Sequence, residues 1–267
     1  MTALEPLLEF LADGGPALPL PDGLATLYGG NLSLDDDALY ANFVQSIDGV
    51  VSLPGVASSG SVISGRHAAD RFVMALLRAC ADAVLVGGGT LRDTPRHHWT
   101  AEHVFPEMAE EFSNLRQLLG LPPQPRLVVL TATGEVDVNH PAVQGGATFL
   151  TTAAGGRRIR ELIPERSSIK DFPGSSVPLA EGVQWLRGEG YRRILSEAGP
   201  HVLGQLVDEG LVRDIFLSVS PILAGRQGAG RLSLVEGIAL APERRVETRL
   251  ASGRRGGDFL LLRYALE

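Results

Sequence analysis

The sequence predicts a three-layer α/β domain built on a mostly parallel sheet. Short apolar runs, typical of buried strands, alternate with stretches of helical periodicity along most of the chain. The last strand-like runs lack a full helix between them, so we expect an antiparallel C-terminal edge of the sheet. No internal repeat or second core pattern is present. These observations together favour one domain with helices on both faces of the sheet.

The first 37 residues are predicted to be an N-terminal extension. Residues 1–12 have the composition of a short helix, which Gly14-Gly15-Pro16 would end. The regular pattern begins only after Asp37. We therefore expect the α/β domain to span residues 38–267.

The first half of this domain gives clear strand and helix signals. Residues 38–45 are predicted to form a strand, followed by the turn-prone residues 46–49. A helix is expected from Ser64-Gly65 to about residue 81, because its apolar residues recur at helical spacing. The apolar run 82–86 is the next strand, and it stops at three consecutive glycines.

The rest of the domain continues the alternation. Residues 101–120 are predicted to form an inserted helix between two strands. The remaining strands are expected at residues 126–130, 147–151, 192–195, 214–219 and near 259–266. Further helices are expected at residues 180–188 and from Pro200 through about residue 209.

Composition excludes several classes of protein. The chain has 31 acidic residues against 24 basic ones, a net charge of -7, whereas nucleic-acid binders have a basic surplus. A single cysteine, Cys80, excludes a disulfide framework and a site with several thiolates. No apolar stretch reaches 18 residues, and the N-terminus lacks a basic segment before an apolar one. We expect a cytoplasmic protein without nucleic-acid or membrane partners.

Two strand ends have the properties of phosphate sites. In open α/β sheets, ligands bind at the carboxyl ends of the parallel strands. Gly87-Gly88-Gly89 follows one strand, and a helix begins at Gly199-Pro200 after another. Absent side chains allow close approach of a ligand, and free N–H groups at a helix start favour an anion. The simpler alternative is that these glycines only form tight turns.

Common enzyme motifs are absent from the sequence. Arg92 replaces the third glycine of G-x-G-x-x-G, and the lone Lys170 follows Ile169, which excludes a Walker A motif. No serine lies in G-x-S-x-G, and one cysteine cannot supply the zinc deaminase signature. His97, His98 and His103 are close together, but no further ligands complete a metal site, so no metal is expected.

Several segments, in order and at regular spacing, are similar to the motifs of one family. They are Asn42-Phe43-Val44-Gln45-Ser46-Ile47-Asp48-Gly49 (N-x-x-x-S-L-D-G), Ile63-Ser64 (I-T-S), Leu77-Arg78-Ala79 (L-R-A), residues 82–90 (D-A-I-L-V-G-x-G-T), Asp93-Thr94-Pro95, Ser196-Glu197-Ala198-Gly199-Pro200 (x-E-G-G-P), residues 210–214 (G-L-V-D-E) and residues 221–225 (P-x-L-x-G). The chain thus resembles the reductase domain of riboflavin biosynthesis, found in 5-amino-6-(5-phosphoribosylamino)uracil reductases and at the C-terminus of bifunctional deaminase-reductases. This resemblance covers roughly residues 38–266.

The resemblance implies a dihydrofolate-reductase-like fold and reduction of a ribosylaminopyrimidine phosphate by NADPH. It implies catalytic roles for Asn42, Asp48 and Glu197, and substrate contacts for Arg78, Glu197 and His97. The cofactor would be bound by Gly87, Gly88, Gly89, Thr90, Asp93, Thr131, Gly199, Pro200, His201, Val202, Leu203, Gly204 and Gln205. Arg157, Arg158 and Arg160 are expected near its 2′-phosphate. Family relatives are commonly homodimers, so a homodimer is expected.

One departure from the family pattern leaves the substrate open. Where the family reads D-P-x-L-x-x-R, with the leucine and arginine helping to hold the ribose phosphate, this chain has His97 and Thr100 in those places. A reductase of a pteridine or another small heterocycle is therefore an alternative. A further alternative is a non-catalytic nucleotide-binding dimeric module. For Arg78, the alternative to a substrate contact is an ion pair on the helix surface.

Overall fold

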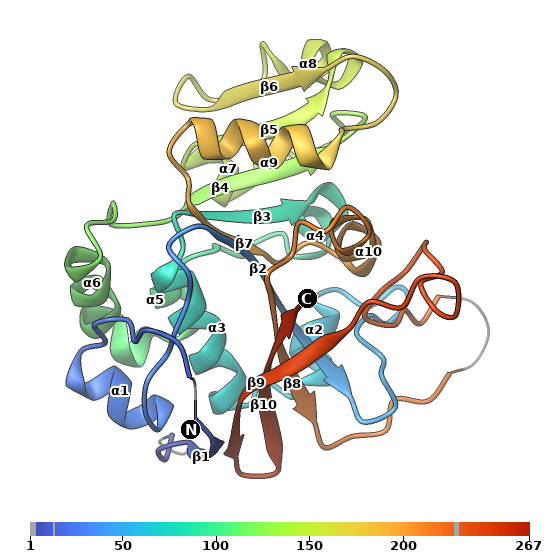
Figure 1. Cartoon of the computed structure of the whole chain (residues 1–267). Coiled ribbons are helices and arrows are strands. Elements are labelled where there is room, and N and C mark those ends of the chain that lie inside the picture. Colours follow the sequence, from blue (N-terminus) through green and yellow to red (C-terminus); the bar gives the residue numbers. More distant parts are fainter. Residues whose placement is uncertain (1–3, 13, 227–229) are drawn as a thin grey trace.

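The structure is a computed structural model that describes residues 4–12, 14–226 and 230–267. Its centre is a ten-stranded sheet with the order β1-β9-β10-β8-β2-β7-β3-β4-β5-β6 (Figure 1). The strands are Leu8–Leu11 (β1), Ala38–Ser46 (β2), Ala83–Gly87 (β3), Arg126–Thr131 (β4), Ala147–Thr152 (β5), Ser168–Phe172 (β6), Arg193–Ser196 (β7), Asp214–Ser220 (β8), Thr248–Gly256 (β9) and Phe259–Leu266 (β10).

The sheet is parallel from β8 to β6 and antiparallel beyond β8. Strands β2, β7, β3, β4, β5 and β6 pair in parallel with their neighbours, and β2 also pairs in parallel with β8. Strand β10 pairs antiparallel with both β8 and β9, and β1 pairs antiparallel with β9. The predicted fold class, a mostly parallel α/β sheet with an antiparallel C-terminal edge, is confirmed.

Helices cover both faces of this sheet (Figure 1). They are Asp22–Tyr28 (α1), Ser59–Ile63 (α2), Ala68–Cys80 (α3), Gly88–Asp93 (α4), Ala101–Val104 (α5), Ala109–Leu118 (α6), Pro141–Gln144 (α7), Ala153–Ile159 (α8), Leu179–Gly188 (α9) and Pro200–Asp208 (α10), with a 3-10 turn at Pro106–Met108. One core contains side chains of α1, α3, α5 and α6, and the core on the other face contains those of α9 and α10. In the described part of the chain, none of the helices has the length and apolarity needed to cross a membrane.

Strand β3 lies in the middle of the sheet because both of its faces are apolar. All five of its residues are buried. Val84 and Val86 belong to the core under α3, whereas Ala83 and Leu85 belong to the core under α9 and α10. An uninterrupted apolar run is therefore what this position requires, and it carries the glycines after Val86 to the carboxyl edge of the sheet.

Helix α3 is fixed at both ends, and this positions Arg78 in its last turn. At its start the His67 ring accepts a hydrogen bond from the backbone N–H of Ala69. At its end the buried Arg116 guanidinium donates to the carbonyls of Arg78, Ala79 and Ala81. Free carbonyls at a helix end need such partners when they are buried. Residue Arg116 of α6 therefore anchors the end of the helix from which Arg78 extends.

The N-terminal segment differs from its prediction. The expected helix within residues 1–12 is wrong, because Leu8–Leu11 form β1 at the edge of the sheet. The helix of this segment is α1, which begins at Asp22, and its residues Leu24 and Tyr28 are buried in the core that includes α3. Edge pairing with β9 overrides the helical propensity of the leucine-rich start. This contact between distant segments has no local signal.

Other elements also differ from their predictions. The helix expected from Ser64 begins only at Ala68 as α3, because Gly65 and Arg66 have left-handed conformations with φ of 58° and 56°; the short helix α2 before Ser64 had not been predicted. The expected helix at residues 101–120 is divided into α5, the 3-10 turn and α6 by Pro106. Strands β6 and β9 had not been predicted. Their sequences, SIKDF and TRLASGRRG, contain too many polar residues to resemble buried strands.

Candidate functional site

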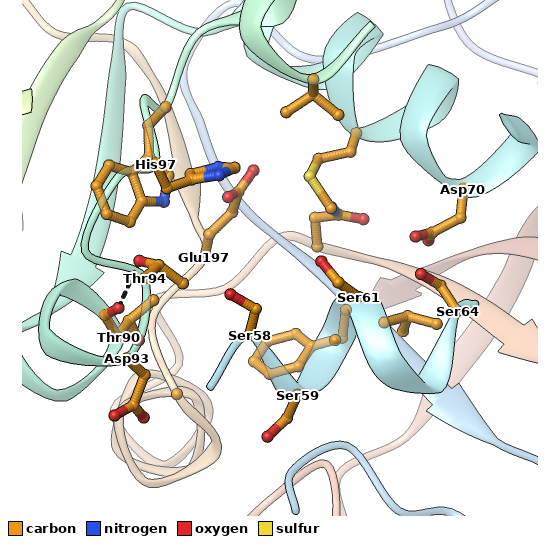
Figure 2. A pocket seen from close by; sticks show the side chains of 18 of the residues that line it. Ser58, Ser59, Ser61, Ser64, Asp70, Thr90, Asp93, Thr94, His97 and Glu197 are labelled. Atoms are coloured by element: carbon orange, nitrogen blue, oxygen red, sulfur yellow. Dashed lines mark hydrogen bonds between the residues drawn. The ribbon is translucent and has the colours of Figure 1, made fainter. Parts of the chain in front are cut away.

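A cleft of about 760 Å³ lies beside the carboxyl ends of β3 and β7. Helix α2, the first turns of α3, helix α4, the loop through Trp99 and the start of α10 surround it. Figure 2 shows Thr90, Asp93 and Thr94 on one side, Asp70 and Ser64 on the opposite side, and His97 and Glu197 between them. A volume of this size is typical of a pocket for a small molecule or cofactor.

Arg78 and Glu197 form a bidentate ion pair in this cleft. The Nε and Nη2 atoms of Arg78 donate to the two carboxylate oxygens of Glu197 at 2.9 and 2.6 Å. Nη1 donates to the carbonyls of His98 and Thr100, and Nη2 also bonds to His97 Nε2 at 2.9 Å. The five N–H donors of the guanidinium thus all have protein partners, and the side chain is 1% exposed.

This pairing changes the expected role of Arg78. The resemblance implies that Arg78 and Glu197 each contact the substrate. The structure instead joins them directly, and Arg78 keeps no N–H for a substrate. The Glu197 side chain is 10% exposed and lines the cleft. Arg78 is therefore a positioning residue, and it holds Glu197 as a carboxylate directed into the cleft.

His97 is neutral in this arrangement. Its Nε2 faces an arginine, which can only donate, so this nitrogen accepts and the proton is on Nδ1. Burial first, and then the Arg78 charge, lowers the pKa of His97 to about 2. The ring packs edge-on against Trp99 and His103, at 5.0 and 4.8 Å between ring centres. In the described residues, no group of three or more His, Cys, Asp or Glu side chains is arranged to hold a metal ion.

Of the two predicted phosphate sites, Gly199 lines the cleft, whereas Gly87, Gly88 and Gly89 are outside its lining and α4 contributes Thr90 and Asp93. Gly87 caps the start of α4 and Gly199 the start of α10, both in extended backbone conformations that any residue adopts. A Cβ on Gly199 would meet no atom within 4 Å, and one on Gly87 would meet only Thr90 Oγ1 at 3.9 Å. Neither turn geometry nor packing requires these glycines. The cofactor contact of these glycines therefore stays a prediction, and so does the alternative that they only form tight turns.

The predicted cofactor residues of α10 separate into two groups. Gly199 and Pro200 line the cleft, but Leu203 is fully buried in the core between α10 and the sheet. Gly204 packs against backbone, since a Cβ there would come within 2.5 Å of the Glu236 carbonyl. His201, Val202 and Gln205 are outside the cleft lining. Only the start of the helix, rather than the whole predicted segment, faces the cleft.

Asp48 and Thr131 have structural partners outside the cleft. The Asp48 carboxylate accepts the backbone N–H groups of Ala224 and Gly225 at 2.9 and 2.7 Å, which ties two loops together. These bonds and one from Ser46 lower the pKa of Asp48 to about 2. The Thr131 hydroxyl accepts the N–H of Gly134 in its own turn. The catalytic role of Asp48 and the cofactor role of Thr131 stay predictions.

The three arginines expected at a 2′-phosphate differ in their partners. Arg158 pairs with Glu135 at 2.7 Å, and Arg160 with Asp171 at 3.2 Å. Arg157 is exposed, and among the described residues no ion pair or hydrogen bond involves its side chain. Arg157 is therefore the arginine of this group whose charge is available to an anion. All three follow β5, outside the lining of the cleft.

A family model described as the RibD C-terminal domain matches residues 38–257. The chain belongs to the RibD C-terminal domain family. This finding confirms the resemblance to the reductase domain of riboflavin biosynthesis. A curated relative, 2,5-diamino-6-ribosylamino-4(3H)-pyrimidinone 5′-phosphate reductase of Archaeoglobus fulgidus, is 25% identical over 213 residues, which are 78% of this chain and 90% of the relative.

Solved structures of related proteins share the fold. A pyrimidine reductase-like protein of Corynebacterium diphtheriae superposes with a TM-score of 0.69 at 20% identity, over 91% of this chain and 98% of the other. The riboflavin biosynthesis reductase Rib7 of Saccharomyces cerevisiae gives 0.61 at 15% identity, over 93% and 95% of the two chains. RibD of Acinetobacter baumannii gives 0.66 at 17% identity, and the match covers 91% of this chain and 60% of RibD.

Two kinds of cleft residue had not been predicted. The first kind is four serines that line the cleft: Ser58 before α2, Ser59 and Ser61 on α2, and Ser64 after it (Figure 2). Asp70, in the first turn of α3, is 3% exposed and also lines it. Of the predicted residues, Asn42 is 9% exposed, and no hydrogen bond of its side chain is present among the described residues. The serine-rich segment 58–64 was a usable signal, whereas Asp70 resembled an ordinary acidic residue at a helix start.

Proposed function

We propose that this protein is an NADPH-dependent reductase of a ribosylaminopyrimidine phosphate. The observation that supports this most directly is that the start of α10, Thr90 and Asp93 of α4, and the Glu197 carboxylate all line one cleft. Membership of the RibD C-terminal domain family agrees with it. The curated relative of Archaeoglobus fulgidus is named as a reductase of such a compound.

The residues of the cleft fit a dinucleotide at one side. The N–H groups at the starts of α4 and α10 suit its phosphates, and Thr90 and Asp93 line the cleft beside them. A 2′-phosphate would pair with the exposed Arg157 after β5, and this pairing would favour NADPH over NADH. When bound, such a cofactor supplies the hydride, and the protein supplies binding, orientation and charge. The roles of the protein's own residues follow from their contacts in the cleft and do not depend on how the cofactor is oriented.

Glu197 and Asn42 would orient the substrate ring. Each carboxylate oxygen of Glu197 receives one bond from Arg78 and retains lone pairs for ring N–H groups. Asn42 presents an amide with two donors and an acceptor, none of them used by the described part of the protein. A pyrimidine with adjacent N–H and carbonyl groups matches this pair. Arg78 contributes by fixing the position of Glu197, because a displacement of about 1 Å can lower the rate about 100-fold.

A second candidate function is reduction of a pteridine or other heterocycle without a phosphate. The residues of the cleft that replace the family's phosphate-binding pattern favour this second function. His97 and Thr100 stand where the family has the leucine and arginine that help hold the ribose phosphate, and Arg78 has no donor left to replace them. A substrate lacking the phosphate would need neither residue.

Steady-state oxidation of NADPH tests both candidates. The protein should oxidise NADPH with the ribosylaminopyrimidine phosphate and not with dihydrofolate. The reverse preference would replace the first candidate by the second. NADPH binding without turnover of either substrate would support the alternative of a non-catalytic nucleotide-binding module. Exposed apolar residues at the sheet edge, including Leu8 at 56% and Phe10 at 52%, also lead us to expect a homodimer, which sedimentation at micromolar concentration tests.

A further inference from the structure

Hydride reduction leaves one requirement unassigned in this cleft. A hydride brings two electrons and one hydrogen nucleus to the acceptor carbon, so the electron pair displaced from that carbon must be taken up with a proton. The titratable side chains that line the cleft, besides its arginines, are Asp70, Asp93, His97, His103 and Glu197. If the protein has the proposed reductase function, on which this inference rests, one of these groups holds that proton.

Most of these groups are unsuited to donate a proton. Both carboxyl oxygens of Glu197 accept N–H bonds from the Arg78 guanidinium, which leaves this group in an ion pair. His97 receives a bond from the same guanidinium, and its pKa is lowered to about 2, so it does not become cationic. Burial also lowers the pKa of His103. Asp93 is exposed to solvent beside Thr90, on the side of the cleft that fits the dinucleotide.

Asp70 is different from the others because it is buried without a cation. It lies in the first turn of α3, 3% exposed, on the side of the cleft opposite Thr90 and Asp93 (Figure 2). Its carboxyl group bonds to the hydroxyls of Ser64, after α2, and Ser218, on β8. The one charged group that acts on it among the described residues is Glu197, which is of like sign. The neighbouring Arg71 directs its guanidinium to the carbonyl of Val104 and to Glu107.

This environment favours the protonated carboxyl. Desolvation disfavours a buried carboxylate, and the Glu197 charge adds to the effect, whereas the two serine bonds oppose it. The result is a pKa of about 6 for Asp70, against an ordinary value of 3.8. A proton donor whose pKa lies near the working pH is both populated and able to release its proton.

We infer that Asp70 is the proton donor of the reduction and contacts the heteroatom of the substrate that leaves the acceptor carbon. The acceptor carbon gains a hydride from a dihydronicotinamide nucleotide, which is oxidised to the nicotinamide form. The bond from that carbon to its oxygen or nitrogen loses one electron pair to the heteroatom. The heteroatom takes the proton from the carboxyl of Asp70, and the resulting carboxylate is reprotonated by water.

Asp70→Asn tests the role of the carboxyl with little change in shape. The variant should lose about 100- to 10,000-fold in kcat, the usual contribution of a positioned proton donor. Wild-type activity should fall with rising pH above about 6, and this limb of the pH profile should be absent from the residual activity of Asp70→Asn. Asp22→Asn, which removes an exposed acid of α1, is the matched control and should leave the profile unchanged.

Ser218→Ala distinguishes a catalytic role of Asp70 from a purely structural one. Ser218 is 2% exposed and lies outside the lining of the cleft, so it reaches a ligand only through Asp70. Its bond lowers the pKa of Asp70, and its removal should move the falling limb of the pH profile to higher pH. A structural defect would lower the whole profile without shifting it. Carbon-13 NMR of the Asp carboxyls, in protein without ligand, should show one carboxyl titrating near pH 6 in wild type and none there in Asp70→Asn.

The outcomes distinguish this inference from the proposed function. Wild-type protein that reduces neither a ribosylaminopyrimidine nor a pteridine would overturn the proposed function, and the inference with it. Turnover by wild type with kcat retained within threefold in Asp70→Asn would overturn the inference alone. The inference would also be overturned if Ser218→Ala did not move the falling limb of the pH profile, or if the carboxyl signal of Asp70 titrated near pH 4.

Discussion

The cleft contains two carboxyl groups, those of Glu197 and Asp70, whose surroundings are opposite in charge. Glu197 is held by both arms of Arg78, and every donor of that arginine is used. Asp70 has two serine hydroxyls and no cation, and its pKa is raised. The first arrangement fixes charge and position before a ligand arrives, whereas the second leaves a group whose protonation responds to pH and ligand. A single cleft thus contains a rigid anchor and a titratable group.

The largest effect is expected when the anchor is broken. Arg78→Ala leaves the Glu197 carboxylate and the carbonyls of His98 and Thr100 without their donors. Loss of one partner of a buried pair costs about 3–5 kcal/mol, and urea unfolding should show a loss of this size. The exposed pair of Arg158 with Glu135 is the control, and Arg158→Ala should cost less than about 1 kcal/mol. Equal costs for the two variants would contradict the contrast between anchor and surface.

The raised pKa of Asp70 should make the free energy of unfolding depend on pH. Because the folded state raises the pKa of Asp70 from 3.8 to about 6, it holds a proton that the unfolded chain releases between these values. Stability from this group is fully present below the unfolded pKa and is lost as pH rises through the folded one. Wild type should therefore lose up to about 3 kcal/mol relative to Asp70→Asn between pH 4 and pH 7.

Parallel unfolding curves at several pH values measure this difference. Asp70→Asn should be the more stable protein at pH 8, because it removes an unpaired buried charge. Asp22→Asn again serves as the control, and its curves should follow those of wild type. A constant difference between wild type and Asp70→Asn across this range would mean that the carboxyl is not perturbed.

A milder change at the anchor should affect chemistry more than folding. Glu197→Gln keeps the shape but removes the charge that pairs with Arg78 and with ring N–H groups. Loss of a charge-assisted hydrogen bond is worth about 1.5–3 kcal/mol, so kcat should fall roughly 10- to 150-fold. Steady-state kinetics on each accepted substrate measures it. Full activity of Glu197→Gln on all of them would remove Glu197 from the substrate site.

The smallest effect is expected outside the cleft, at Arg157. Arg157→Ala should weaken NADPH binding about tenfold and leave NADH binding unchanged, since only NADPH has the 2′-phosphate. Arg160→Ala should change NADPH binding less, because Asp171 already pairs with Arg160. Fluorescence titration with both nucleotides measures these affinities. Equal weakening of NADH and NADPH would place Arg157 away from the 2′-phosphate.

Local pattern was sufficient for much of the fold. Strands β2, β3, β4, β5, β7, β8 and β10 are continuous apolar or alternating runs, and their ends were predicted to within about two residues. The motifs in the sequence identified the RibD C-terminal domain family. They also singled out Glu197, the start of α10, and Thr90 and Asp93 of α4, which line one cleft. The spacing of apolar residues and the residue types that favour turns are properties of neighbouring residues, so the sequence alone reveals them.

Other features depended on contacts between distant segments. Strand β1 exists because β9, more than 200 residues later, offers an open edge. The roles of Arg78 and Asp70 were decided in the same way. The sequence shows an arginine and an aspartate on one helix, but only the tertiary structure places Glu197 against the first and no cation against the second. Burial and charge pairing are set by the whole fold, and they determine which carboxyl is an anchor and which one holds a proton.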